Sequence, residues 1–113
     1  MKPVTDMSFM FFNKRTFNSD ISNWDMSSVT NMDGMFYGAK NFNSDISNWN
    51  IARVTNMESM FESASKFNQT LCPWGPKLPF DYAANAGFMF DSSGCLDKNS
   101  PTGPWCAVTN CTA

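Results

Sequence analysis

The chain repeats itself every 25 residues, and this repeat constrains its fold more than any other feature of the sequence. The segment FNSDISNWDMSSVTNMDGMF at residues 17–36 returns as FNSDISNWNIARVTNMESMF at residues 42–61. A fixed period with matching apolar columns is typical of a solenoid, in which each unit buries its apolar face against its neighbours. We therefore expect a core of side-chain ladders running through stacked coils. The aligned columns are Val4, Val29 and Val54; Met7, Met32 and Met57; Met10, Met35 and Met60; Phe11, Phe36 and Phe61; Phe17, Phe42 and Phe67; Ile21, Ile46 and Leu71; and Trp24, Trp49 and Trp74.

The repeat predicts two parts. Three regular coils, at about residues 4–28, 29–53 and 54–78, form a solenoid over residues 1–75, and residues 76–113 form a degenerate coil with a C-terminal cap. Prolines interrupt the pattern around Trp74, and a four-residue insertion then places Met89 and Phe90 in the core columns. Because residues 4–7 already lie inside a repeat, we expect a longer or processed chain in which another segment covers the first coil.

Each coil divides into two halves. In the first half the apolar spacing i, i+3, i+4 and i+7 predicts a short amphipathic helix. Thr55 with Glu58 matches a capping box at its start, and Thr30 with Asp33 is a weaker version. The second half predicts a short strand or extended turn at residues 20–24 and 45–49. The expected fold class is therefore α/β, a right-handed solenoid. The helical stripes are Met32, Met35, Phe36 and Ala39, and Met57, Met60, Phe61 and Ala64.

Polar residues also form columns. We expect Asn18, Asn43 and Asn68 to point inward and build a structural ladder that bonds backbone groups, in preference to a ligand site. Asp20 and Asp45 could hold a divalent cation with neighbouring serines, but hard cations need about six or more oxygen ligands, which favours turn-capping carboxylates.

The methionine and tryptophan columns each have two interpretations. Nine methionines suggest a soft binding surface, and a tryptophan ladder suggests a stacking platform for sugars. Because both columns keep the same position in every coil, packing in the core is the favoured interpretation. We expect the indole N–H groups to bond backbone.

All four cysteines lie from residue 72 onward, in the irregular C-terminal part. An even count in such a segment predicts a disulfide-stapled cap and an oxidising compartment. Spacing alone allows three pairings, of which we favour Cys72 with Cys95 and Cys106 with Cys111. A zinc site is the alternative, although the chain has no CxxC pair and no histidine.

Composition argues against several functions. The formal net charge is −2 and the basic residues are scattered, which disfavours nucleic-acid binding. No window approaches the length of a membrane span. No histidine, paired carboxylates or phosphate-binding glycine loop indicates catalysis, so we expect neither an enzyme nor a bound cofactor or metal.

The pattern FNxDISNWDxSSVTNMxxMFxxAxxFN resembles the BspA-like repeat surface proteins, whose 25-residue unit is grouped with leucine-rich repeats. The resemblance covers residues 4–74 and, more loosely, the coil containing Phe88-Met89-Phe90. The cysteine-containing segments at residues 71–74 and 104–106 resemble those of relatives in microalgae. The resemblance implies an extracellular or cell-surface solenoid that binds a protein or glycan. The chain has no lipidation cysteine near its start and no long array, so the resemblance to surface lipoproteins does not extend to membrane anchoring.

Two function classes remain. The first is a recognition module whose solenoid face binds protein or glycan, with Ser22, Asn23, Ser47 and Asn48 as candidate binding residues. The second is a structural subunit that docks into a larger assembly through its first coil. Phe9 and Phe12 indicate this second class, because the later coils carry Gly34 and Tyr37, then Ser59 and Glu62, in those columns. The candidate binding residues on this side are Phe9, Phe12 and Tyr37. Coverage by an upstream coil explains the same residues equally well.

Overall fold

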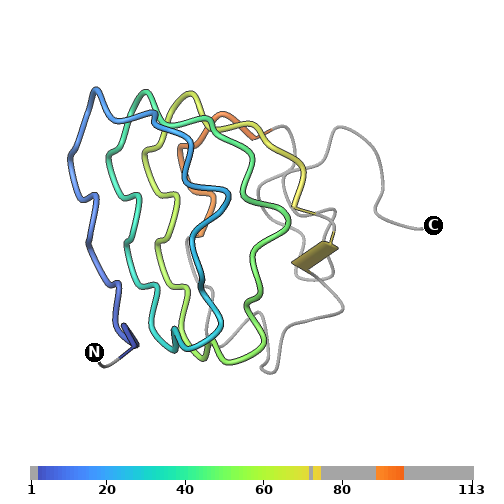
Figure 1. The fold of residues 1–113 in the computed structure, drawn as a ribbon. Coiled ribbons are helices and arrows are strands. Elements are labelled where there is room, and N and C mark those ends of the chain that lie inside the picture. The colour runs from blue at the N-terminus through green and yellow to red at the C-terminus, as the bar shows by residue number, and fades with distance from the viewer. Residues whose placement is uncertain (1–2, 72, 75–88, 96–113) are drawn as a thin grey trace.

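The computed structural model of the chain describes residues 3–71, 73–74 and 89–95. The backbone forms coils that stack side by side, with residues one repeat apart at equivalent places (Figure 1). Isolated parallel bridges join Asp6 to Asn31 and Asn31 to Asn56. Residues 89–95 continue the stack, because the Phe61 N–H donates to the Met89 carbonyl at 2.8 Å.

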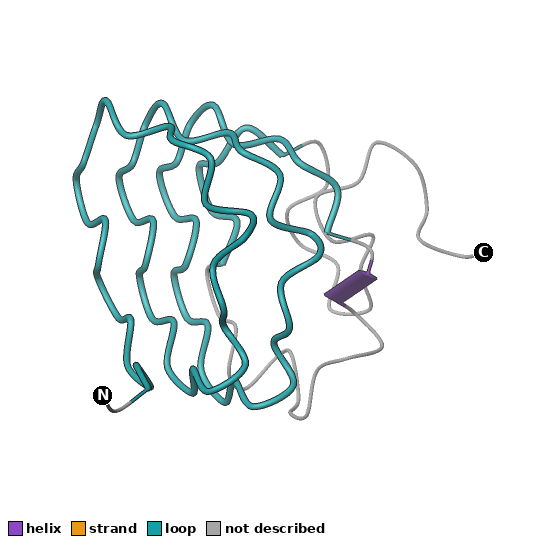
Figure 2. Ribbon diagram, in the orientation of Figure 1, coloured by secondary structure: helices purple, strands orange, loops and turns teal. Residues whose placement is uncertain are grey.

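The predicted α/β class is wrong. Helix accounts for 3% and strand for 4% of the interpretable structure. Among the described residues the regular structure consists of the isolated bridges and a 3₁₀ turn at residues 73–74, and Figure 2 draws almost all the rest as loops and turns.

Successive β-turns replace the expected helices. In coil two the Met35 N–H donates to the Met32 carbonyl at 3.2 Å, and the Ala39 N–H donates to the Phe36 carbonyl at 3.0 Å. These are i to i+3 bonds, whereas an α-helix bonds i to i+4. The first and last residues of both turns are 0% exposed, which gives the same i, i+3, i+4, i+7 burial as a helix. The predicted core residues are therefore buried although the predicted element is absent.

The third residue of each turn decides between the two structures. Gly34 and Gly38 have φ of 54° and 71°, and Asn13, Ser59 and Ser63 adopt positive φ at equivalent positions. A type II turn requires positive φ at this position, where glycine, asparagine and other small polar residues are tolerated best. Residues of a right-handed α-helix have negative φ, so these residues cannot belong to one.

The predicted capping boxes and strands are also absent. The Thr55 Oγ1 hydroxyl donates to the Thr30 carbonyl of the previous coil at 3.1 Å, and the Glu58 N–H donates to Asn56 Oδ1 at 3.0 Å. Residues 20–24 and 45–49 contain turns, such as the one closed by the Trp49 N–H and the Ile46 carbonyl at 3.1 Å.

One side of the stack, which we call the turn wall, consists of residues 6–13, 31–38 and 56–63. The hydrogen bonds that join one segment of the turn wall to the next all run in one direction, although the Asn31 N–H also donates back to the Thr5 carbonyl, outside the wall, at 3.4 Å. The Phe9 N–H donates to the Asp33 carbonyl at 2.8 Å, and the Gly34 N–H donates to the Glu58 carbonyl at 2.8 Å. Each coil of the turn wall therefore donates from one edge and accepts on the other.

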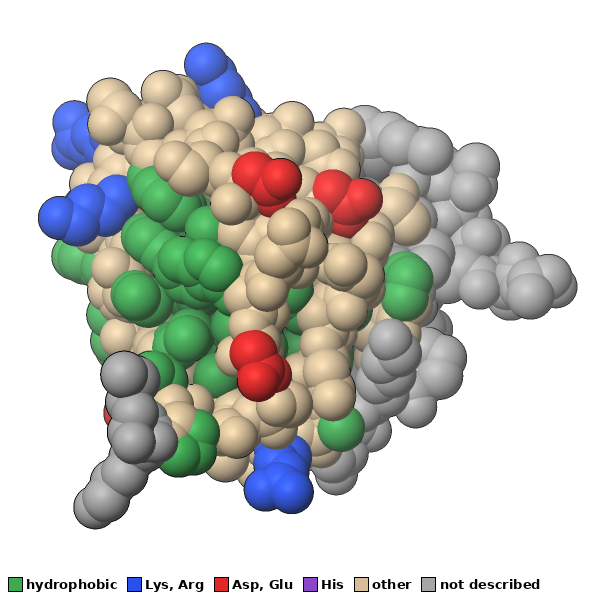
Figure 3. Space-filling model, in the orientation of Figure 1, with side chains coloured by type: hydrophobic (Ala, Val, Ile, Leu, Met, Phe, Trp, Pro, Cys, Tyr) green, Lys and Arg blue, Asp and Glu red, His purple; other side chains and the backbone are tan. Residues whose placement is uncertain are grey.

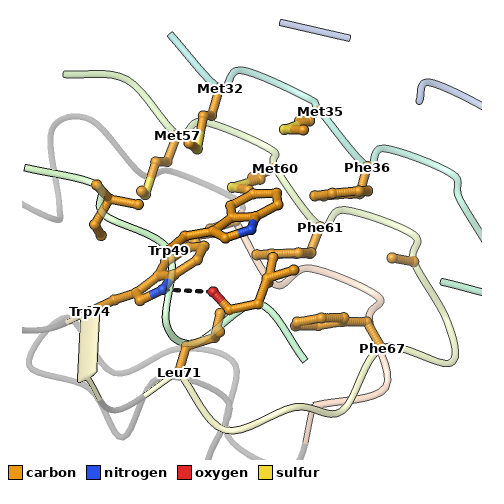
Figure 4. Close-up of a cluster of buried hydrophobic side chains, with 14 of the residues drawn as sticks. Met32, Met35, Phe36, Trp49, Met57, Met60, Phe61, Phe67, Leu71 and Trp74 are labelled. Carbon is orange, nitrogen blue, oxygen red and sulfur yellow. Dashed lines mark hydrogen bonds between the residues drawn. The ribbon is translucent and has the colours of Figure 1, made fainter. Parts of the chain in front are cut away.

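Aromatic ladders fill the core, as the repeat predicts. Figure 4 shows the buried cluster around Phe36, Phe61 and Trp74. Phe36 and Phe42 stack within one coil at a centroid distance of 4.0 Å, and Phe36 lies 5.5 Å from Phe61 in the next coil. The Trp49 indole N–H donates to the Ile21 carbonyl at 3.1 Å and the Trp74 indole N–H to the Ile46 carbonyl at 3.3 Å. The prediction of a core tryptophan ladder is confirmed for these two residues, whereas Trp24 is 37% exposed.

The asparagine ladder is confirmed as a structural feature, but its side chains are exposed and not inward as predicted. Asn18 Oδ1 accepts the Asn43 N–H at 2.8 Å, and Asn43 Oδ1 accepts the Asn68 N–H at 2.8 Å. Gln69 Nε2 adds a bond to the Asn43 carbonyl at 2.8 Å. Each amide oxygen therefore caps a backbone donor of the following coil.

The disulfide prediction is not tested by the described residues. Cys95 is buried in the core, but Cys72, Cys106 and Cys111 lie outside the part of the chain that the structure describes. The preferred pairing stays a prediction. Among the described residues no helix has the length and apolar character needed to cross a membrane.

Candidate interaction surfaces

A polar groove of about 430 Å³ crosses the first two coils on the side that carries the asparagine ladder. Two pairs of equivalent residues line it, Asp20 with Asp45 and Ser22 with Ser47, because residues one repeat apart occupy equivalent places in neighbouring coils. It therefore presents carboxylate and hydroxyl groups that recur from one coil to the next, together with one amide, which suits ligands with several hydrogen-bonding groups. The lining residues are Asp20, Ser22, Ser44, Asp45, Ser47 and Asn48.

The two aspartates of the groove have a turn-capping role. Asp20 Oδ1 accepts the Ser22 N–H at 3.0 Å, and Asp45 Oδ1 accepts the Ser47 N–H at 2.9 Å. The bond from the Ser22 backbone lowers the pKa of Asp20 below its ordinary value. In the described part of the chain, no group of three or more Asp, Glu, Cys or His side chains is placed to hold a metal ion.

Three of the four predicted polar binding residues line this groove. Ser22, Ser47 and Asn48 lie together, whereas Asn23 is not part of the lining. Both asparagines are exposed.

The second surface is the coil-one end, the exposed face of the first coil, formed by Phe9, Met10, Phe11, Phe12 and Phe17. The side chains of Phe9, Met10 and Phe12 are 54%, 47% and 44% exposed, although the later coils bury the Met10 and Phe11 columns completely. Figure 3 shows apolar side chains gathered on the side of the molecule where the first coil lies. A groove of about 370 Å³ within this face is lined by Met10, Phe11, Lys14, Thr16 and Phe17.

The rings of the coil-one end are the exposed start of the core ladders. Phe11 and Phe17 stack at 4.0 Å, as the corresponding ring pairs of the later coils do. Phe11 then lies 5.4 Å from Phe36, and Phe17 lies 5.8 Å from Phe42. The outer faces of Phe11 and Phe17 therefore offer a stacking position that matches the spacing inside the core.

The three aromatic residues predicted as a docking site lie in a row. Phe9 and Phe12 form an edge-to-face pair at 5.9 Å, and Phe12 lies 5.3 Å from Tyr37. Phe9 also has φ of 56°, and its ring covers Gly34, where an added Cβ would meet it. The missing side chain of Gly34 makes room for this ring.

Acidic side chains occupy equivalent places on the turn wall. Asp33 Oδ1 is buried and has no hydrogen-bond partner. Burial, followed by the negative charge of Glu58, raises the pKa of Asp33 above its ordinary value. By contrast, Asp6 caps the Ser8 N–H at 2.9 Å, and this backbone bond lowers its pKa. Asp33 is thus a point of local destabilisation in its ionised form.

Sequence reasoning missed part of each surface. The sequence predicts turn-capping roles for Asp20 and Asp45, which the structure confirms, but these residues also line the polar groove with Ser44. Met10, Phe11 and Phe17 were assigned to the core, although the first coil has no described neighbour on its outer side. The repeat contains this signal, because coil one has no described coil before it to cover its ladder residues.

Residues 1–103 match the family described as "Mycoplasma protein of unknown function, DUF285". The chain belongs to the DUF285 family. The match includes all three regular coils and both interaction surfaces of this DUF285 protein. No curated protein and no solved structure matches the chain.

Proposed function

We propose that this DUF285 protein is a non-catalytic recognition module that binds a protein or glycan through the polar groove, at a cell surface or in an extracellular space. The observation that carries this proposal is the groove of about 430 Å³, in which the same polar groups recur one coil apart. Repeated hydroxyl and carboxylate groups can bond a ligand that itself repeats, such as a glycan or an extended peptide. The resemblance to BspA-like surface proteins and the predicted oxidised cysteines support the location.

Asn48 provides the sharpest test of the groove. Asn48 lines it and Asn23, its counterpart in the previous coil, does not, while both are exposed and neither side chain has a hydrogen bond in the described structure. Asn48→Ala should therefore weaken binding without unfolding the chain, and Asn23→Ala is the matched control.

The measurement uses the labelled full chain on an array of immobilised glycans and purified extracellular proteins. Each ligand that binds is then titrated with both variants. A loss of about tenfold in affinity for Asn48→Ala alone supports the groove as the site. Equal affinity for the two variants would show that the ligand binds elsewhere.

A second candidate function is docking through the coil-one end. The exposed Phe9, Met10 and Phe12 support it, because a large exposed apolar patch is usually an interaction site. Phe9→Ser with Phe12→Glu introduces residues that coil three already carries, so the fold should remain while docking is lost. Ser59 has φ of 58°, so serine already occurs with this backbone angle in the equivalent turn. Intact binding by this double variant would argue against docking through the end.

A further inference from the structure

The outer edge of coil one carries a row of backbone acceptors that no described residue uses. In coil two the equivalent carbonyls accept N–H groups from coil one, for example Asn31 from Met7 at 2.9 Å and Tyr37 from Asn13 at 2.7 Å. In coil one these carbonyls accept no backbone N–H from the described residues, and all four residues are at least partly exposed. The row consists of the carbonyls of Asp6, Ser8, Met10 and Phe12.

The direction of these groups restricts what can bind there. A partner must present N–H groups at alternate residues along one edge, without its own carbonyls facing the row. The edge of a β-strand presents both N–H and C=O groups, so its carbonyls would find no free N–H donor along this row. If a second copy of the chain docked through the same row, carbonyls would face carbonyls along the whole contact. The turn wall meets the requirement at alternate residues, because the N–H groups of Met32, Gly34, Phe36 and Gly38 all donate to the following coil.

The apolar side chains of the coil-one end fit the same partner. Phe11 and Phe17 offer their outer faces with the spacing that Phe36 and Phe42 use one coil further on. The groove of about 370 Å³ beside them has space for apolar side chains of an incoming coil. Backbone register and ring stacking therefore select one type of segment.

We propose that the coil-one end binds a coil of the same 25-residue repeat from another polypeptide, in parallel and head to tail. The occupant donates the N–H groups of residues equivalent to Met32, Gly34, Phe36 and Gly38 to the four carbonyls of the row. This inference rests on docking through the coil-one end, the second of the two proposed functions. It adds the class of partner and the direction of assembly.

The test uses a synthetic peptide with the sequence of residues 29–48, titrated into the full chain and followed by calorimetry. Two control peptides have nearly the same apolar content. One is N-methylated at the four donor positions, and the other has the reversed sequence. We expect saturable binding of the unmodified peptide, and binding about tenfold weaker or more for each control. Equal binding of all three would reduce the site to a non-specific apolar patch and overturn the inference.

A fused chain tests the same contact if the free peptide is too poorly ordered to bind. A copy of residues 29–53 is placed directly before Val4, which keeps the repeat in register, and amide hydrogen exchange is measured. The four donor N–H groups of the added coil should be protected, whereas rapid exchange at all four would overturn the inference.

Sedimentation of the unmodified chain gives a further check, because a dimer abolished by Phe9→Ser with Phe12→Glu would identify a second copy as the occupant. If that double variant loses docking while N-methylation has no effect, docking stands and the backbone register is wrong.

Discussion

Replacing Phe36 with alanine should destabilise the chain far more than the same change at its neighbour Tyr37. Phe36 is 0% exposed and lies at the centre of the ring ladder. Its centroid is 4.0 Å from that of Phe42 and 5.4 Å and 5.5 Å from those of Phe11 and Phe61. Tyr37 is the second residue of the turn that Phe36 begins. It is half-buried, and its ring contacts the exposed Phe12 at 5.3 Å.

The expected magnitude follows from these surroundings. Removing a fully buried phenylalanine ring costs about 3–5 kcal/mol, and the parallel rings above and below leave little freedom to fill the cavity. Tyr37→Ala should cost about 1 kcal/mol, because water already reaches one side of that ring. Phe11→Ala should fall between the two, since the same column is open on one side in coil one. A small domain has about 5–15 kcal/mol of stability, so Phe36→Ala uses a large share of it.

Denaturant unfolding of the three variants, followed by circular dichroism and tryptophan fluorescence, measures these differences. The predicted order of loss is Phe36, then Phe11, then Tyr37. Equal losses of stability at Phe36 and Tyr37 would show that the wrong residues of the turn have been placed in the core. Equal losses of stability at Phe36 and Phe11 would show that the coil-one end is not exposed.

Other variants test the turns, the acidic column and the asparagine ladder. Ser59→Gly should stabilise the chain by about 1 kcal/mol, because a non-glycine residue is strained at φ of 58°. Gly34→Ala should destabilise it by about 1–2 kcal/mol for the same reason, and thermal melts with the opposite signs would contradict the turn assignment. Asp33→Asn should raise the stability of the chain at pH 7, because the raised pKa of Asp33 means that its ionised form destabilises the folded state. This gain in stability should vanish as the pH falls through the raised pKa, and a gain that grows in acid would contradict the prediction. Asn43→Ala should cost about 1 kcal/mol and speed exchange of the Asn68 amide, and an unchanged exchange rate would argue against the ladder.

The sequence predicts the contents of the core well and the backbone that holds them poorly. Val29, Met32 and Phe36 are buried as the repeat predicts, because the ladders depend only on residues returning to the same place in every coil. The helix prediction fails because two successive four-residue turns bury the same i, i+3, i+4 and i+7 positions as a helix. Gly34 and Gly38, four residues apart, are the signal that favours turns, since a short helix would rarely carry two glycines.

The surfaces divide in a similar way. Ser22 and Ser47 could be paired from the repeat alone, and the structure places them in one groove. The direction of the hydrogen bonds between coils of the turn wall could not be predicted, because it depends on which N–H groups already close turns within a coil. Among the described residues the Met35 N–H closes a turn while the Phe36 N–H leaves the coil, and sequence spacing does not distinguish the two.

The hydrogen bond made by the Phe36 N–H tests the central claim, that the coils are built from turns and bonded edge to edge, most directly. The structure has this N–H donating to the Met60 carbonyl of the next coil at 2.8 Å, whereas a helix would direct it to the Met32 carbonyl four residues earlier. Scalar couplings across hydrogen bonds, measured by NMR on isotopically labelled protein, identify the acceptor. A coupling from the Phe36 amide nitrogen to the Met60 carbonyl carbon is the predicted result. A coupling to the Met32 carbonyl carbon would contradict the account.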